Sequence, residues 1–188
     1  MNSGKTHAFF TWTSTNAWVP PLDGTTPSPF FSYSNYTTPP PPLASHDPAP
    51  NNPNKSWVRP DYIVKVDDDA FVMLAELESR LRVELHQPPR NAYLSHSDPL
   101  IYWGYLVTSR YRFMAGELYA LTWSLVDWVA QDPTVKGLTR GAEDKQTAKW
   151  MLLHPRASEI RWTSERCWIY DHPRSGTVYV HVTSTPPA

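Results

Sequence analysis

The sequence predicts an α/β domain in which a mixed sheet is flanked by helices. Short β-rich runs alternate along the chain with segments whose apolar residues recur every three or four positions, as layered α/β domains require. The clearest strand covers residues 62–66, and the helix expected after it covers residues 70–85. The 188 residues suffice for one domain, and nine Trp and ten Tyr supply large side chains for a core.

Before this domain the chain has an aromatic segment and a proline-rich one. Residues 7–19 are expected to form the end of a helix or a buried strand, and we interpret residues 1–19 as the remnant of a preceding element. Residues 20–60 hold more than half of the 20 Pro residues and predict a disordered loop, because Pro cannot join a central strand or a helix interior. Glycosylation sequons at Asn35 and Asn54 fall inside it.

Ordered structure is expected over residues 61–182, followed by a short tail at residues 183–188. Leucines recur on one face of the helix at 70–85, which Pro88 and Pro89 end. The further elements, in order, are a strand at 100–107, a helix from Gly116 to Gln131, a helix that opens with Gly141 to Asp144 and runs to about Leu153, and short strands at 159–162, 167–170 and 177–182.

The first candidate site is the run Asp67-Asp68-Asp69, where strand 62–66 ends. Ligands bind at the carboxyl ends of strands in open α/β sheets. Strand alternation would put Asp67 and Asp69 on one side, where a hard divalent cation such as Mn²⁺ or Mg²⁺ would relieve their repulsion and grip a diphosphate. The alternative is a solvated turn in which Asp69 caps the following helix.

Two further groups could complete a site. Glu143 and Asp144 open a helix, whose positive terminus favours an ionised carboxylate able to act as a general base. His181 lies on the polar side of its strand and could complete a metal shell. The alternatives are helix capping for the acidic pair and a partly buried polar residue for His181.

Composition excludes several classes of function. The formal net charge is −1 and no run of Lys or Arg occurs, so a phosphate-backbone-binding face for nucleic acid is not expected. The sequence contains no stretch of eighteen apolar residues, the length needed to span a membrane. Cys167 is the single cysteine, which excludes an intrachain disulfide and a Cys-based zinc site.

Three separated motifs together resemble the β-1,3-galactosyltransferase family, in particular its fungal branch. The segment Val64 to Val72 is similar to the family's K-x-D-D-D-x-F metal motif, Met114 to Leu121 to its Gly-centred segment, and Gly141 to Asp144 to its E-D motif. Their order and spacing also match, and the resemblance covers about residues 5–181. It implies a partial GT-A-like, Rossmann-like nucleotide-sugar transferase fold.

The resemblance also implies an activity and roles for individual residues. The family transfers a hexose, often galactose, from a UDP-sugar to a glycan or glycoprotein acceptor, with inversion and a metal ion. Carried over by position, Asp144 is the catalytic base. Asp67, Asp69 and His181 are the metal ligands, and the residues expected to bind the sugar nucleotide are Asp67, Asp68, Gly116 and Glu143.

The family is membrane-anchored and works in the Golgi lumen, whereas this chain carries no anchor of its own. Only 66 residues precede Asp67, and the family places a nucleotide-binding half there. We therefore expect an N-terminally truncated member. Three hypotheses stay open: an active UDP-hexose transferase, an inactive remnant or non-catalytic module that binds a cation or glycan, and an unrelated acidic module.

Overall fold

The computed structural model describes residues 3–19, 58–87, 99–108, 110–165, 169–171 and 178–180. Their elements, in chain order, are α1 (Ser3–Asn16), β1 (Tyr62–Val66), α2 (Leu74–His86), β2 (Ile101–Thr108), β3 (Arg112–Thr122), α3 (Trp123–Gln131), α4 (Pro133–Gly137), α5 (Glu143–Leu153), the 3₁₀ turn η1 (Ala157–Glu159), β4 (Arg161–Ser164), β5 (Ile169–Asp171) and β6 (Val178–Val180).

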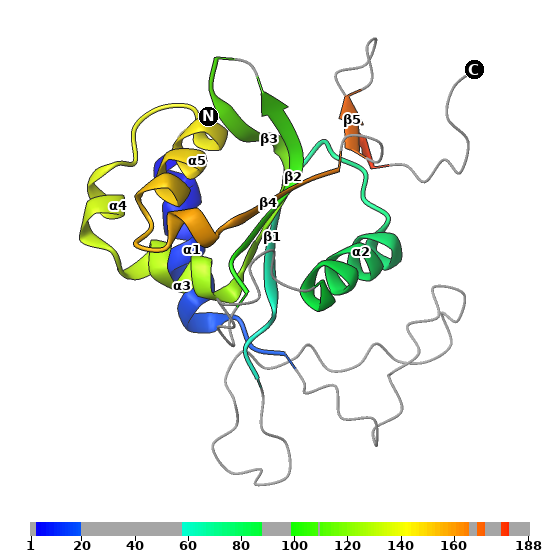
Figure 1. Cartoon of the computed structure of the whole chain (residues 1–188), viewed down its shortest axis with the longest axis horizontal. Coiled ribbons are helices and arrows are strands. Elements are labelled where there is room, and N and C mark those ends of the chain that lie inside the picture. The colour runs from blue at the N-terminus through cyan, green and yellow to red at the C-terminus, as the bar shows by residue number, and fades with distance from the viewer. Residues whose placement is uncertain are drawn as a thin grey trace, which may run out of the picture.

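Four strands form one sheet in the order β1-β3-β2-β4, and β5 and β6 form a separate pair (Figure 1). Strand β3 pairs antiparallel with both β1 and β2, whereas β4 runs parallel to β2. The sheet is therefore mixed, and helices lie on both of its faces. The α/β class and the mixed sheet that the sequence predicts are confirmed.

The two faces of the sheet carry different helices (Figure 1). Side chains alternate along a strand, so Tyr119 and Leu121 of β3 face one side while Leu118 and Ala120 face the other. The first side packs against buried residues of α1, α3, α4 and α5, including Phe10, Leu125, Val135 and Trp150. The second side packs against Leu77 and Leu81 of α2. Both faces of β3 are consequently buried.

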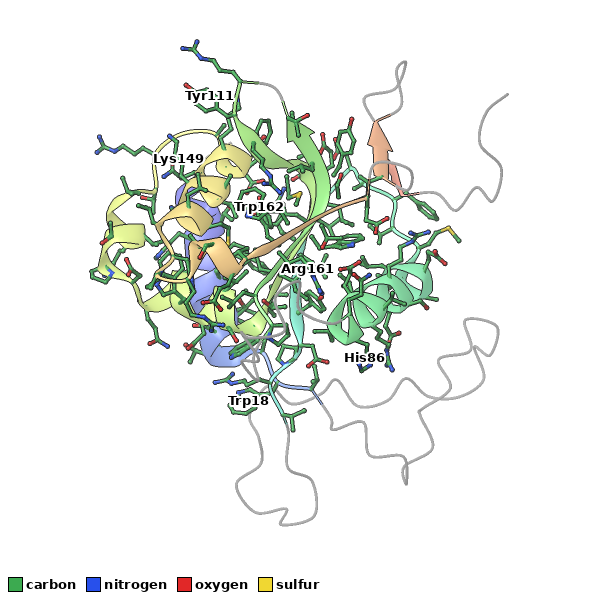
Figure 2. All side chains as sticks on the ribbon, in the orientation of Figure 1. Trp18, His86, Tyr111, Lys149, Arg161 and Trp162 are labelled. Carbon is green, nitrogen blue, oxygen red and sulfur yellow. The ribbon has the colours of Figure 1, made fainter. Side chains whose placement is uncertain are left out.

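Helix α2 is tied to the edge strand β4 by polar contacts as well as by apolar packing. Arg161 reaches from β4 towards α2 (Figure 2), where its guanidinium donates to the Glu84 carbonyl and, at 3.3 Å, to the Gln87 carbonyl. The Glu84 carboxylate lies 3.4 Å from Arg161 and accepts a 3.1 Å hydrogen bond from the Thr163 hydroxyl. These contacts give the buried Glu84 carboxylate its partners.

Strand 62–66 occurs as the sequence predicts, and the helix expected to open with Gly141 to Asp144 begins at Glu143 and ends at Leu153. The aromatic segment before the proline-rich loop is a helix, α1, rather than a strand. The helix expected from Gly116 to Gln131 is wrong in its first half, because residues up to Thr122 continue β3 and α3 begins only at Trp123. Leu118 and Leu121 fit a helical stripe, but they belong to a strand buried on both faces, where apolar residues need not alternate.

Several smaller predictions need correction or lie outside the described residues. Asp69 does not cap a helix, since α2 begins at Leu74 with Met73 as its N-cap. The strand expected at 159–162 begins at Arg161, after η1. Residues 20–57, Cys167 and the tail at 183–188 lie outside the described ranges. Within those ranges, no helix is long and apolar enough to cross a bilayer.

Candidate functional site

The end of β1 opens into the acidic turn. The Asp67 backbone N–H donates to the Glu117 carbonyl at 2.9 Å, so pairing with β3 continues one residue past the strand. The chain then turns, with the Ala70 N–H donating to the Asp67 carbonyl at 3.2 Å. Asp68 and Asp69 are exposed on this turn. The strand alternation that we used to place Asp69 beside Asp67 therefore does not extend to Asp69.

Lys65 joins three of the residues that the sequence singles out. Its side chain leaves β1 on the same face as Ile63, towards α1 and α5, and its ammonium donates to the Asp67 carboxylate and to the Gly116 carbonyl. The same nitrogen lies 3.1 Å from Glu143 Oε1. We call Lys65, Asp67, Gly116 and Glu143 the Lys65 cluster. It links the end of β1, the middle of β3 and the start of α5.

Glu143 is the most deeply buried charge of the cluster, with a side chain only 4% exposed, against 14% for Lys65. Its Oε2 accepts hydrogen bonds from the Tyr119 hydroxyl at 2.9 Å and from the Thr6 hydroxyl at 3.1 Å. Its Oε1 faces Lys65 as an ion pair without the alignment of a hydrogen bond. Helix α1 thereby contributes a donor to the cluster.

Tyr119 is fully buried, and its hydroxyl lies beside Glu143. Burial raises the pKa of its hydroxyl well above the ordinary value, and the neighbouring Glu143 carboxylate raises it further. The raised pKa favours the neutral hydroxyl, which donates its hydrogen bond to Glu143. A buried carboxylate needs such donors, because an unpaired charge in this environment is costly.

Gly116 is needed where β3 passes the start of α5. A Cβ added there would lie 3.1 Å from Glu143 Oε1 and 3.8 Å from Asp144 Cβ. The carboxylate cannot move away easily, because Thr6 and Tyr119 hold its other oxygen. Close approach of strand and helix, rather than backbone conformation, therefore explains this glycine.

Asp144 follows Glu143 in the first turn of α5 and is half-buried. Its Oδ1 accepts a 2.6 Å hydrogen bond from the backbone N–H of Lys145. This bond satisfies one of the first N–H groups of the helix, which have no partners within the helix. The structure thus sets a solvent-accessible carboxylate beside Gly116, next to the buried cluster.

The acidic turn has the chemistry of a hard-cation site, but its ligands are not assembled into one. Asp68 and Asp69 form no hydrogen bond or ion pair with the described residues, so both carboxylates are available to a cation. One oxygen of Asp67 is already engaged by Lys65. Over the described ranges, no three His, Cys, Asp or Glu side chains meet in an arrangement that could hold a metal ion. His181 lies outside those ranges.

Thr6 and Tyr119 are the site residues that sequence reasoning missed, and it gave Lys65 no role. Thr6 lies among other polar residues of α1, whereas Tyr119 has a polar hydroxyl in a largely apolar stretch of β3, and such a group must find a partner when it is buried. That signal exists in the sequence, but it does not say which distant carboxylate is the partner. Comparison of the chain with known protein families, curated proteins and solved structures gives no match.

Proposed function

We propose that this chain is the metal-binding and acceptor part of a UDP-sugar-dependent hexosyltransferase with a GT-A-like fold, of the β-1,3-galactosyltransferase type. The single observation that carries the proposal is the meeting of three distant sequence motifs. Lys65 and Gly116 are 51 positions apart, yet the ammonium of one bonds the carbonyl of the other, and Glu143 pairs with the same ammonium. These are the segments that carry the family resemblance.

In this proposal Asp144 is the catalytic base. It takes the proton of an acceptor hydroxyl while that oxygen forms a bond to the anomeric carbon of the donor sugar. The bond from the anomeric carbon to the diphosphate breaks, and its electron pair leaves with UDP. Glu143 is too buried and too fully bonded for this task, so its part is to position the start of α5.

The acidic turn would hold the cation. Asp67 and Asp69, with His181, would bind Mn²⁺ or Mg²⁺, and Asp68 would lie near the nucleotide. When bound, such a cation neutralises charge on the departing diphosphate. The oxygen donors of Asp68 and Asp69 support this role, as does the absence of a partner for either carboxylate among the described residues. A Golgi location and a glycan or glycoprotein acceptor follow from the family resemblance.

The test combines cation binding with turnover. Mn²⁺ with UDP should raise the melting temperature in a concentration-dependent way, because a ligand that binds only the folded state stabilises it. Asp69→Ala should abolish the shift, whereas Asp61→Ala, which removes an exposed carboxylate outside the turn, should keep it. Asp144→Asn should keep the shift and remove UDP release from UDP-galactose in the presence of a glycan acceptor.

A non-catalytic cation- or glycan-binding module is the second candidate, and one observation favours it. Lys65 already engages Asp67, and over the described ranges no three His, Cys, Asp or Glu side chains meet around a cation position, so the metal shell that turnover would use is not assembled there. In that case Mn²⁺ shifts the melting temperature of the wild type, but no UDP release is measured with any UDP-hexose. Absence of both the shift and turnover would reject the two candidates together.

A further inference from the structure

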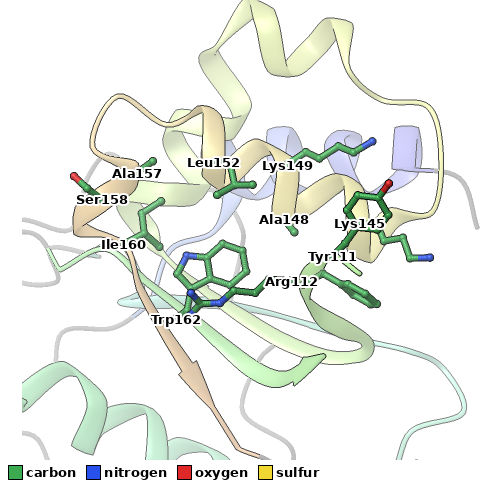
Figure 3. Close-up of a pocket in the computed structure, with 11 residues that line it drawn as sticks. Tyr111, Arg112, Lys145, Ala148, Lys149, Leu152, Ala157, Ser158, Ile160 and Trp162 are labelled. Carbon is green, nitrogen blue, oxygen red and sulfur yellow. The ribbon is translucent and has the colours of Figure 1, made fainter. Parts of the chain in front are cut away.

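A cavity of about 520 Å³ lies between α5, the start of β3 and the start of β4 (Figure 3). We call it the α5 cavity. Its described lining residues are Tyr111, Arg112, Phe113, Lys145, Ala148, Lys149, Leu152, Ala157, Ser158, Ile160 and Trp162. Neither the Lys65 cluster nor Asp144 is among them. The α5 cavity is thus a separate feature from the candidate site.

The walls of the α5 cavity are mainly apolar. Phe113, Ala148 and Ile160 are buried members of the core, and Trp162 is half-buried with its ring centroid 4.8 Å from that of Tyr102. Leu152, by contrast, is 66% exposed at the cavity edge. A ligand with an apolar body would remove the edge leucine and the aromatic walls from water, which is favourable. A volume of this size is typical of small-molecule sites.

Three cations stand at the rim of this apolar space and have no carboxylate partner among the described residues. Arg112, Lys145 and Lys149 are exposed, and none of the described lining residues is acidic. The Arg112 guanidinium carbon lies 4.7 Å from the centroid of the Trp162 ring, and the Lys145 ammonium lies 5.5 Å from that of Phe113. The aromatic walls therefore hold two of the cations at the cavity.

Other cations of the described chain face a carboxylate. Examples are the pairs Lys65–Glu143, Arg80–Glu165, Arg82–Glu78, Arg156–Glu159 and Arg161–Glu84. Within the described ranges Arg112, Lys145 and Lys149 form no ion pair. An anionic ligand would supply the charge that the protein does not.

We propose that the α5 cavity binds a small organic anion with a flat apolar body, such as an aromatic carboxylate, sulfonate or phosphate. The ring system lies between Trp162, Ile160 and Leu152, and the anionic group faces Arg112 and Lys149. This binding does not depend on the transferase activity, so loss of one leaves the other intact.

Isothermal titration of the full chain with naphthalene-2-sulfonate tests the proposal, with naphthalene-2-sulfonamide as the uncharged compound of the same shape. The sulfonate should bind at one site per chain and about fivefold or more tighter than the sulfonamide, the size expected of one exposed ion pair. High salt should remove most of this preference by screening. Equal affinities, or no binding of the sulfonate, would overturn the assignment.

Two pairs of variants locate the binding. Lys149→Gln removes a cation at the cavity, and Lys136→Gln removes an exposed cation of α4 that does not line it. Leu152→Glu puts a carboxylate at the cavity edge, and Leu153→Glu makes the same change at the next, also exposed, position of α5. Lys149→Gln should weaken the sulfonate about fivefold without changing sulfonamide binding.

Leu152→Glu should weaken both compounds, and the sulfonate more strongly. All four positions are exposed on helices, and far-UV circular dichroism checks that each variant is folded. If Lys136→Gln or Leu153→Glu weakens the sulfonate as much as its partner variant does, the ligand is bound elsewhere and the proposal fails.

Discussion

At the scale of single residues, Glu143 carries more of the local structure than its neighbours in the acidic segments. One of its oxygens receives hydroxyls from Thr6 and Tyr119, and the other faces the Lys65 ammonium. Removing one partner of a buried ion pair is costly, because the remaining charge is left buried and unpaired. Asp144, one residue further, is bonded only to the backbone of its own turn among the described residues and is available for chemistry.

Replacing Glu143 by Gln should destabilise the protein by about 1–3 kcal/mol, because the side chain keeps its shape but Lys65 loses a buried counter-charge. Urea unfolding measures the effect. The control is Glu78→Gln, which removes the exposed partner of Arg82 and should cost at most about 0.5 kcal/mol. Equal costs for the two variants would show that Glu143 is not held as the structure indicates.

His154, at the end of α5, predicts a pH dependence of stability. Burial lowers the pKa of its ring from 6.5, and the nearby Arg156 lowers it further. Its Nδ1 accepts a 3.0 Å hydrogen bond from the Arg156 backbone N–H, which requires that nitrogen to be unprotonated. The unfolded chain therefore binds this proton more readily, and the contribution to stability is present above pH 6.5 and lost as the pH falls through it.

His154→Asn keeps an acceptor oxygen for the Arg156 N–H but does not titrate. The free energy of unfolding of the wild type should therefore fall relative to that of His154→Asn as the pH drops below 6.5. Urea unfolding of both proteins on either side of that pH measures the difference. A constant difference would contradict the lowered pKa.

Which residues form the site could be predicted only in part at this scale. Short local motifs contain four of the site residues and so identify them from the sequence: Asp67, Gly116, Glu143 and Asp144. Thr6 and Tyr119 could not be assigned, since their partner lies 137 and 24 positions away and only folding brings them together. The position of Asp69 was also beyond reach, because it depends on where β1 stops pairing.

At the scale of elements, the sequence predicts the helices and strands that bury apolar residues on one face only. β1 is a short β-rich run, and α2 carries a single leucine stripe, so both elements occur, although α2 begins only at Leu74 instead of residue 70. The strand β3 does not show such a one-sided pattern, because helices cover both of its faces and every residue from Leu118 to Thr122 is buried. A continuous apolar run of this kind fits a strand or a buried helix equally well.

The packing of α2 gives a prediction at this scale. Leu81 is buried against the second sheet face, whereas Val83, two residues later on the same helix, is 60% exposed. Leu81→Ala should cost about 2–4 kcal/mol through lost burial and the cavity left behind, and Val83→Ala should change stability little. Chemical denaturation of both variants provides the comparison. A small cost at Leu81 would mean that α2 is only loosely attached.

At the scale of the whole molecule, the order β1-β3-β2-β4 explains how the candidate site is assembled. β3 lies between β1 and β2, so a residue at its centre can meet both the end of β1 and the helix packed above it. The sequence predicts most of the strands and helices but places a helix over the second half of β3, and strand order and direction depend on long-range pairing that local periodicity does not record. The gathering of Asp67, Gly116 and Glu143 follows from that pairing.

Stability should also be distributed unevenly over the molecule. The central strand β3 is paired on both sides and covered by helices on both faces, whereas β5 and β6 form a pair of three-residue strands separate from the main sheet. Core strands open only with global unfolding, and short two-stranded pairs open at low cost. Native-state hydrogen exchange should therefore find the amides of Tyr119 and Leu121 far more protected than those of β5.

The amide of Ile169 gives a stringent comparison within this experiment. Its side chain is buried against the α2 side of the sheet, and its N–H donates to the Glu165 carbonyl at 3.0 Å, so burial alone would predict strong protection. If protection instead depends on how many strands pair with the residue's own strand, the amide of Ile169 should exchange before that of Leu121. Equal protection of the two amides would show that β5 unfolds together with the main sheet as one cooperative unit.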